Sequence, residues 1–306
     1  MQFPQSKGLI AVLWGVGFSM GILFFFMITK YYGPFVPMKD TYLNIVKKSE
    51  ILSQMRINLL KSVEMEKNAV MAQTDVESQE FANQSLAAST LVEQNFKLLR
   101  SLIDATSLQD EEKLVSEFNT CWTEFRKLDQ VILELAVQNT NLKATGLSRE
   151  QAADSMRRFE LALEDVIRSN PGNPNEGRVA GAAWHAITAG LQIFNLHSSH
   201  IAEISDEKMA QIETQMKVDE QEASKSLDEL TGIVGKDSND ALLQAKEAFS
   251  EFMEVTVKVI KLSRQNSNIK SLELSLGRKR KVTAQCEEIL ATFQEAVHDR
   301  PFKAAK

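Results

Sequence analysis

Asparagine amides are the groups most able to hold a small polar solute in this sequence. Asn139 and Asn266 each interrupt a stripe of apolar residues that recurs at helical spacing, and they lie 127 positions apart. An amide on such a stripe either fixes the alignment of neighbouring helices and caps a turn, or lines a pocket that orients a ligand. Asn68 and Asn195 are separated by the same 127 positions, and the same alternatives apply to them.

Histidine and cysteine offer weaker chemistry. His197 and His200 share one face of a predicted helix and Glu203 follows, a spacing that could hold a metal ion. No cysteine or acidic motif adds further ligands at metal-binding spacing, so we expect no metal. Cys121 and Cys286 both fall on apolar stripes, where buried free thiols are expected.

Signatures of catalysis are missing from the sequence. It contains no glycine-rich phosphate loop, no nucleophile elbow and no carboxylate pair with a supporting pocket. We therefore expect no catalytic residue, no cofactor and no enzyme activity. The formal net charge of −6, without a stripe of basic and aromatic residues, makes nucleic acid an unexpected partner.

The asparagines belong to an internal duplication. The sequence QNTNLK at 138–143 returns as QNSNIK at 265–270. Aligned without a gap, residues 122–148 and 249–275 share nine identical positions, where roughly one or two would be expected by chance. The chain therefore contains two copies of one helical unit.

Long helices must position these residues. Glycine and proline are absent from residues 39–144 and 237–275, which predicts uninterrupted helices. Thr74 and Glu77 have the spacing of a capping box that opens the second helix, and Gly146 is expected to end the third. We predict an all-α protein, with one N-terminal transmembrane helix followed by two tandem up-down four-helix bundles of long helices.

The proposed domain boundaries follow from one apolar run and one loop-forming segment. Residues 9–29 carry no charge and are long enough to span a bilayer, whereas residues 171–177 are rich in proline, glycine and asparagine. The prediction is a short tail at 1–8, a transmembrane anchor at 9–29, a first bundle at 39–170, a linker at 171–177, a second bundle at 178–300 and a tail at 301–306.

Four segments carry a resemblance to a known family. They are MRINLL at 55–60, EKNAVMA at 66–72, WTEF at 122–125 and NTNLKA at 139–144. Together they resemble the four-helix-bundle ligand-sensor domain of methyl-accepting chemotaxis receptors. The two copies behind one anchor are similar to the helical bimodular sensor domains of the same receptors.

This resemblance implies a bundle that binds small molecules between helices, often at a dimer interface. It places a single-pass protein in the bacterial inner (cytoplasmic) membrane, with its bundles on the periplasmic side. Arg56 matches an arginine that pairs with a carboxylate ligand in some relatives, although a solvated or ion-paired arginine is the alternative. The candidate ligand-binding residues are Arg56, Asn68, Asn139, Asn195 and Asn266.

The sequence also departs from that family. It shows no second membrane span, no HAMP linker and no methylated signalling hairpin, so we expect the chain to act through a partner. The predicted function is a membrane-anchored sensory module for signal transduction or chemotaxis, which binds a small solute, a second copy of itself or a chemoreceptor-like partner. The alternative is a structural or adaptor bundle that docks other envelope proteins and binds no small molecule.

Overall fold

The structure is a computed structural model that describes residues 35–104, 109–235 and 239–299. All regular secondary structure in these ranges is helical, which confirms the predicted all-α class with long helices. The predicted anchor at 9–29 and the two tails lie outside the described residues. Within the described ranges, no helix is long and apolar enough to cross a membrane.

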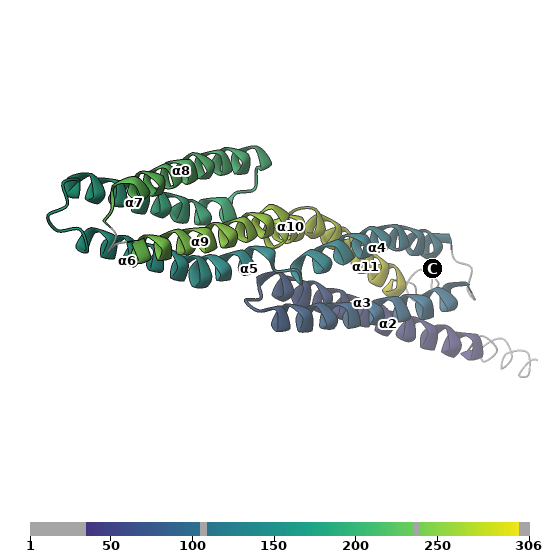
Figure 1. Cartoon of the computed structure of the whole chain (residues 1–306). Coiled ribbons are helices and arrows are strands. Elements are labelled where there is room, and N and C mark those ends of the chain that lie inside the picture. Colours follow the sequence, from purple (N-terminus) through teal and green to yellow (C-terminus); the bar gives the residue numbers. More distant parts are fainter. Residues whose placement is uncertain (1–34, 105–108, 236–238, 300–306) are drawn as a thin grey trace, which may run out of the picture. The chain divides into compact units, whose positions relative to one another are not determined.

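Ten α-helices and two π-helical turns make up the described ranges (Figure 1). They are α2 (Phe35–Met71), α3 (Asp75–Asp104), α4 (Gln109–Ala136), α5 (Thr140–Leu147), η1 (Ser148–Ala152), α6 (Ala153–Arg168), α7 (Glu176–Ala202), α8 (Asp206–Ile233), α9 (Asn239–Gln265), α10 (Ser267–Leu274), η3 (Ser275–Lys279) and α11 (Arg280–His298). The predicted cap of the second helix is confirmed, because the amide of Glu77 donates to Thr74 Oγ1 at 3.2 Å.

The third helix ends earlier than predicted. We expected it to run to Gly146, but α4 ends at Ala136, and a new helix starts at Thr140 and continues through η1 to Arg168. The expected stop at Gly146 is therefore wrong, because Gly146 lies inside α5. The second copy repeats this pattern, since its helix from Ser267 continues through η3 into α11.

The helices form two compact units that do not follow the two copies in sequence. Of the described residues, 35–60, 88–122 and 284–299 belong to the first unit, apart from the gap at 105–108, and 61–87 and 123–283 belong to the second, apart from the gap at 236–238. The predicted bundles at 39–170 and 178–300 follow the copies instead. The difference arises because α5 and α6 of the first copy pack against α7 and α9 of the second.

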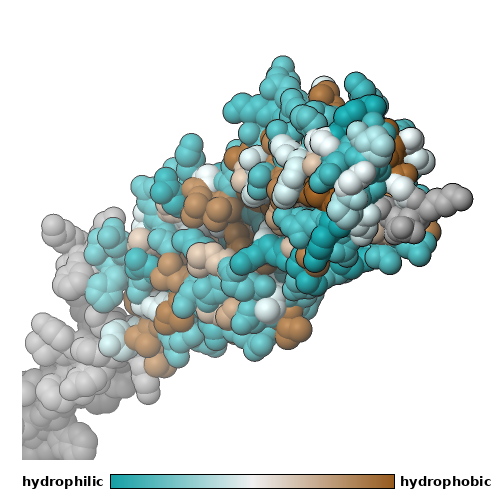
Figure 2. All heavy atoms as spheres, turned by 60° about the vertical axis from the view of Figure 1, so that its left-hand side comes forward, coloured by the Kyte–Doolittle hydropathy of each residue, from teal (hydrophilic) through white to brown (hydrophobic). Residues whose placement is uncertain are grey.

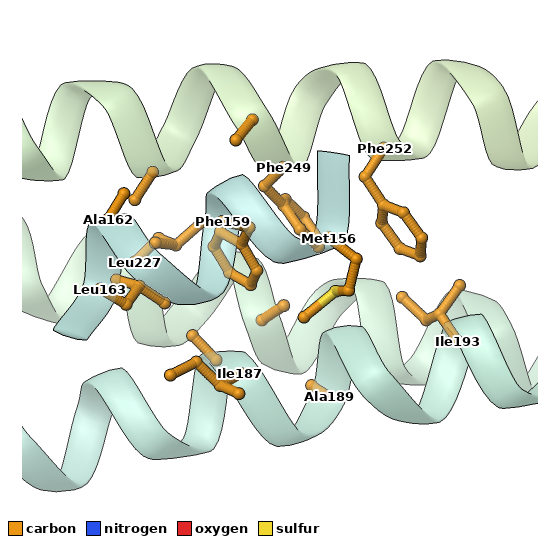
Figure 3. Close-up of a cluster of buried hydrophobic side chains, with 14 of the residues drawn as sticks. Met156, Phe159, Ala162, Leu163, Ile187, Ala189, Ile193, Leu227, Phe249 and Phe252 are labelled. Atoms are coloured by element: carbon orange, nitrogen blue, oxygen red, sulfur yellow. The ribbon is translucent and has the colours of Figure 1, made fainter. Parts of the chain in front are cut away.

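The second unit is built around a core of apolar side chains from α6, α7, α8 and α9 (Figure 3). Phe159 of α6 packs against Phe249 of α9, with ring centroids 5.1 Å apart. On α7, Gly190 allows a close approach, since a Cβ atom there would lie 3.0 Å from Met156 Sδ. These contacts position η1 and α7, which carry the candidate site.

The first unit joins α4 to α11 covalently. Cys121 of α4 and Cys286 of α11 form a disulfide, with Cα atoms 5.7 Å apart. The expected free thiols are therefore wrong, because α11 lies beside α4 and brings the two apolar stripes together. Gln294 of α11 also donates to Ser53 Oγ of α2 at 3.2 Å.

Apolar side chains are not confined to the cores. On the face shown in Figure 2, hydrophobic residues emerge between hydrophilic ones. The large exposed examples on α2 are Tyr42, Leu43, Val46, Ile57, Leu60 and Met71.

Candidate functional site

Asn139 and Asn266 break their helices in the same way. Both adopt the left-handed backbone conformation, with φ of 51° and 55°, and no other non-glycine residue in the described ranges has a positive φ. Asparagine tolerates this conformation because its short side chain can hydrogen-bond locally. Helices α4 and α9 end just before these residues, and α5 and α10 begin directly after them.

The two breaks cap each other. The backbone amide of Thr140 donates to Ser267 Oγ at 3.1 Å, and the amide of Ser267 donates to Thr140 Oγ1 at 3.0 Å. The amides of Asn141 and Asn268 each donate to the other residue's Oδ1, at 3.1 and 3.3 Å. Since the first amides of a helix have no partner within it, each copy supplies the capping groups for the other.

The side chains of Asn139 and Asn266 belong to the same network. Asn266 donates to the carbonyl oxygen of Glu203 at 2.9 Å and accepts from Asn141 Nδ2 at 2.8 Å. Asn139 accepts from Asn268 Nδ2 at 3.0 Å. Both side chains are buried. Hydrogen bonds within the protein therefore account for these two amides without a bound solute.

Asp75 ties the first break to the start of α3. Asn139 Nδ2 donates to Asp75 Oδ1, and Lys143 forms an ion pair with Asp75 Oδ2, both at 3.0 Å. The hydrogen bonds from Asn139 and Lys143 lower the pKa of the Asp75 carboxyl. Lys143 also donates to the carbonyl oxygen of Gln138, at the last residue before the break.

Asn195 lines a pocket of about 480 Å³ in the second unit. The pocket lies between the α5–η1 segment and α7, and its lining residues are Thr145, Ser148, Arg149, Phe194, Asn195, Ser198, Ile201 and Ala202. Among the described residues, the Arg149 guanidinium and the Asn195 amide have no hydrogen-bond or ion-pair partner. The Arg149 guanidinium and the Asn195 amide are therefore available to bind a ligand beside the apolar side chains of the pocket.

His197 lies buried behind this pocket and is neutral. Thr256 Oγ1 donates to the carbonyl oxygen of Phe252, so it must accept from His197 Nε2, which is 3.1 Å away. The other ring nitrogen, Nδ1, then accepts from the hydroxyl of Ser148 at 3.0 Å. Burial, together with the nearby His200, lowers the pKa of His197 to about 4.

A cluster of charged residues joins α2 and α4 of the first copy to η3 of the second. Lys279 Nζ is 2.7 Å from Asp129 Oδ1 and 3.9 Å from Glu66 Oε2, and it lies 3.5 Å from the centroid of the Phe125 ring. All three charged side chains are buried. Their counterparts 127 positions away, in the same order, are Ala152, Thr256 and Ile193. The two sets of equivalent positions have therefore diverged: the side chains of one set are charged, and those of the other are neutral.

Glu66 is the least satisfied member of this cluster. Neither carboxylate oxygen makes a hydrogen bond with the described residues. Burial raises the pKa of the Glu66 carboxyl, although the Lys279 ammonium opposes this effect. Burial also lowers the pKa of Lys279, opposed by the charge of Asp129. Our sequence analysis missed the cluster because its members lie far apart in sequence.

The remaining candidate residues do not converge on one point. Arg56 is exposed on α2, within the first unit, whereas the four candidate asparagines belong to the second. Asn68 is half-buried on α2, at the position equivalent to Asn195. These placements single out Asn195 as the candidate that lines a pocket together with an unpaired arginine.

The histidine motif serves a different purpose from metal binding in this structure. Glu203 accepts from the backbone amides of Ile204 and Ser205, both at 2.9 Å, rather than joining the two imidazoles. His200 contacts Glu213, a residue that our sequence analysis did not consider. In the ranges that the structure covers, no three potential ligands are grouped as a metal site would require.

Part of the chain matches a known protein family. Residues 36–172 match the family model of the four-helix-bundle sensory module for signal transduction. No curated protein matches the chain. The match begins at the start of α2 and ends just after α6, so it includes the first break and η1.

Proposed function

Because residues 36–172 match the model of the four-helix-bundle sensory module for signal transduction, we propose that the chain is a membrane-anchored receptor module for a small solute. The observation that carries this proposal is the pocket lined by Arg149 and Asn195. An unpaired guanidinium favours a planar anion such as a carboxylate, and an amide can add a hydrogen bond. The apolar side of the pocket suits a ligand with a short hydrocarbon body.

The position of the pocket supports a signalling role. One wall belongs to the helix that starts at the Asn139 break, and the other belongs to α7. Asn141 donates to the carbonyl oxygen of Ile201 in the last turn of α7, and Asn266 donates to that of Glu203, which follows α7. A ligand that bridges Arg149 and Asn195 would favour one spacing of these two helices. Such a differential contact is what a ligand needs in order to shift a conformational equilibrium.

The compartment is part of the proposal. The uncharged run at 9–29 suits a single-pass anchor in the inner membrane. A disulfide between Cys121 and Cys286 suits the oxidising periplasm, since reducing cytosol disfavours such bonds. A reporter fused after Lys306 tests this topology, because cytoplasmic activity of the reporter would contradict it.

A partner is proposed from the surface of α2. Leu43 and Ile57, and likewise Val46 and Leu60, are separated by 14 residues, and all four are exposed. An apolar row on one long helix suits a second helix, as in a homodimer or a complex with a chemoreceptor-like protein. We expect Ile57→Cys to form an intermolecular disulfide in native membranes, whereas Asn44→Cys should not, because this exposed polar position lies roughly 140° around the helix from Ile57.

Ligand binding is tested with thermal unfolding and calorimetry. The full chain in detergent is screened against small carboxylates, amines and uncharged solutes. We expect stabilisation by a carboxylate, and loss of that stabilisation in Arg149→Leu and Asn195→Ala. Leucine is the residue that the second copy carries at the position of Arg149, namely Leu276.

The duplication supplies a matched control for this experiment. Asn68→Ala removes the amide at the equivalent position of the first copy and should leave binding unchanged. If no solute stabilises the chain, the adaptor alternative gains support, and co-purification of a protein partner becomes the next test. If solutes bind equally well to Asn195→Ala and Asn68→Ala, the pocket is not their site.

A further inference from the structure

His200 occupies the last turn of α7, where it is fully buried and bonded through both ring nitrogens. Nδ1 lies 2.8 Å from Ser263 Oγ, and Nε2 lies 2.8 Å from Glu213 Oε1. The Ser263 hydroxyl also lies 2.9 Å from the carbonyl oxygen of His200, and when it donates its one hydrogen there it accepts a hydrogen from Nδ1. An ionised Glu213 can only accept, so Nε2 also donates. In this arrangement of hydrogen bonds, His200 is an imidazolium.

The carboxylate of Glu213 favours this charged form, whereas the positive charge of Arg264 opposes it. Arg264 of α9 binds both oxygens of Glu213, at 2.7 and 2.9 Å, and keeps it ionised. Arg264, followed by His200, lowers the pKa of the Glu213 carboxyl. On α7, His197 is neutral. At the start of α8, Asp206 Oδ1 faces Arg264 at 3.5 Å.

The backbone next to His200 leads to the second helix break. Glu203, which follows the end of α7, donates its amide to the His200 carbonyl oxygen at 3.4 Å. The carbonyl oxygen of Glu203 accepts from Asn266 Nδ2 at 2.9 Å. Ser263 precedes Asn266 by three residues. The hydrogen bond from Ser263 to the His200 carbonyl therefore ties the ends of α7 and α9 together beside the break.

Removing one proton from the His200 ring would break the hydrogen bond from Ser263 to the His200 carbonyl oxygen. With Glu213 ionised, the proton must leave Nδ1, because Nε2 still has to donate to the carboxylate. The bare Nδ1 then needs a donor, and the Ser263 hydroxyl can serve only by turning away from the His200 carbonyl oxygen. The protonation state of His200 therefore determines whether the Ser263 hydroxyl donates to the His200 carbonyl oxygen or to His200 Nδ1.

We propose that His200 is a proton-sensing residue, which locks the end of α7 to the end of α9 beside Asn266 when charged and releases it when neutral. The proton is then an input separate from any solute in the Arg149 pocket, so the proposal goes beyond solute sensing. The first copy has no such device. Its residues at the positions of His200, Glu213, Ser263 and Arg264 are Gln73, Leu86, Ala136 and Val137.

The test is hydrogen exchange of the full chain in detergent, at about pH 5 and about pH 8, the range in which histidines change charge. Backbone protection factors are compared for residues 203 and 266–268. In the unmodified chain we expect protection to fall roughly fivefold at the higher pH, the effect of losing about one hydrogen bond. His200→Gln should remove this pH dependence, since glutamine is neutral at both values.

Two further variants keep the test decisive. His197→Gln removes a neighbouring histidine that is already neutral, and should retain the pH dependence. Glu213→Gln keeps an acceptor for Nε2 but removes the negative charge, and should move the loss of protection to lower pH. An equal loss of protection in His200→Gln and the unmodified chain would overturn the proposal.

A measurement on the unmodified chain covers the case in which a variant fails to fold. The Cε1 NMR signal of each labelled histidine reports its protonation state. The signal of His200 should move between its charged and neutral positions over the same pH range. A His200 ring that stays neutral down to about pH 5 would contradict the imidazolium and sink the proposal.

Discussion

Thr140 and Ser267 lie 127 residues apart, and the backbone amide of each donates to the side-chain hydroxyl of the other. This reciprocal contact explains why the surrounding motif survives in both copies. Lys143 donates to the carbonyl oxygen of Gln138, and Lys270 makes the same bond to Gln265. The repeated motif encodes a helix break whose caps come from the other copy.

Removing one hydroxyl of this pair should destabilise both helix starts. We expect Thr140→Ala and Ser267→Ala each to lower the free energy of unfolding by about 1 kcal/mol, as for other helix caps. The double variant should cost less than the two single variants together, because they disrupt one shared arrangement. Denaturant unfolding followed by circular dichroism measures this difference. Thr214→Ala, which removes an exposed hydroxyl from α8, is the control and should change stability by less than about 0.5 kcal/mol.

The left-handed asparagines give a second prediction. Asn266→Ala should cost about 1–3 kcal/mol, because alanine disfavours a positive φ and leaves the Glu203 carbonyl without its donor. Asn266→Gly should cost less, since glycine adopts this conformation freely and loses only the side-chain bonds. Denaturant unfolding of both variants shows which substitution lowers the free energy of unfolding more. If alanine were tolerated better than glycine, backbone conformation would not explain the choice of asparagine.

Local sequence patterns correctly predicted the long helices and the Thr74 cap, because both depend on residues close in the chain. The break at Asn139 was not predicted, since Asn139 continues the helical spacing of its apolar stripe. Its left-handed conformation is stabilised by partners 60 or more residues away, including Asp75. Tertiary contacts therefore override the local preference for a continuous helix.

The disulfide and the buried charges escaped the sequence analysis for a related reason. Cys121 and Cys286 occupy non-equivalent positions of the repeat, and they meet only because α11 lies beside α4. Lys279 lies in a run of four basic residues at 278–281, a pattern typical of a solvated face, but it is buried against Asp129. In both cases the missing information was which helices pack together, which periodicity alone does not specify.

The charged cluster predicts opposite outcomes for two carboxylates. Asp129→Asn should cost about 3–5 kcal/mol, because it leaves the buried Lys279 without its close partner. Glu66→Gln should be tolerated or stabilising at neutral pH, because burial raises the pKa of Glu66 and penalises its charged form. Thermal unfolding of both variants at neutral pH gives the contrast.

The pH dependence of Glu66→Gln follows from the same shift. The folded state holds the Glu66 proton more tightly than the unfolded state does, so this carboxyl favours folding fully below its unfolded pKa of 4.5. That contribution is lost as the pH rises through the raised folded pKa. The advantage of Glu66→Gln should therefore grow with pH. An advantage that is largest in acid would show that Glu66 is stabilising as a carboxylate.

His197 predicts a loss of stability in acid. Its pKa is about 4 in the folded protein, against 6.5 for the free side chain. Between these two pH values the imidazole is protonated in the unfolded chain but not in the folded one. The contribution of His197 to the free energy of unfolding is therefore fully present above pH 6.5 and is lost as the pH falls to about 4. A shift of this size corresponds to roughly 3 kcal/mol.

The difference between two variants isolates this contribution from other groups that titrate in acid. In His197→Gln the neutral amide can still contact Ser148 and Thr256, and it does not titrate, so the fall in stability between about pH 6.5 and pH 4 should become shallower. His185→Gln changes an exposed histidine of the same helix and should retain the slope of the unmodified chain. Denaturant unfolding at several pH values gives both slopes. Equal slopes for the two variants would mean that the buried ring accepts a proton without leaving its bonds to Ser148 and Thr256.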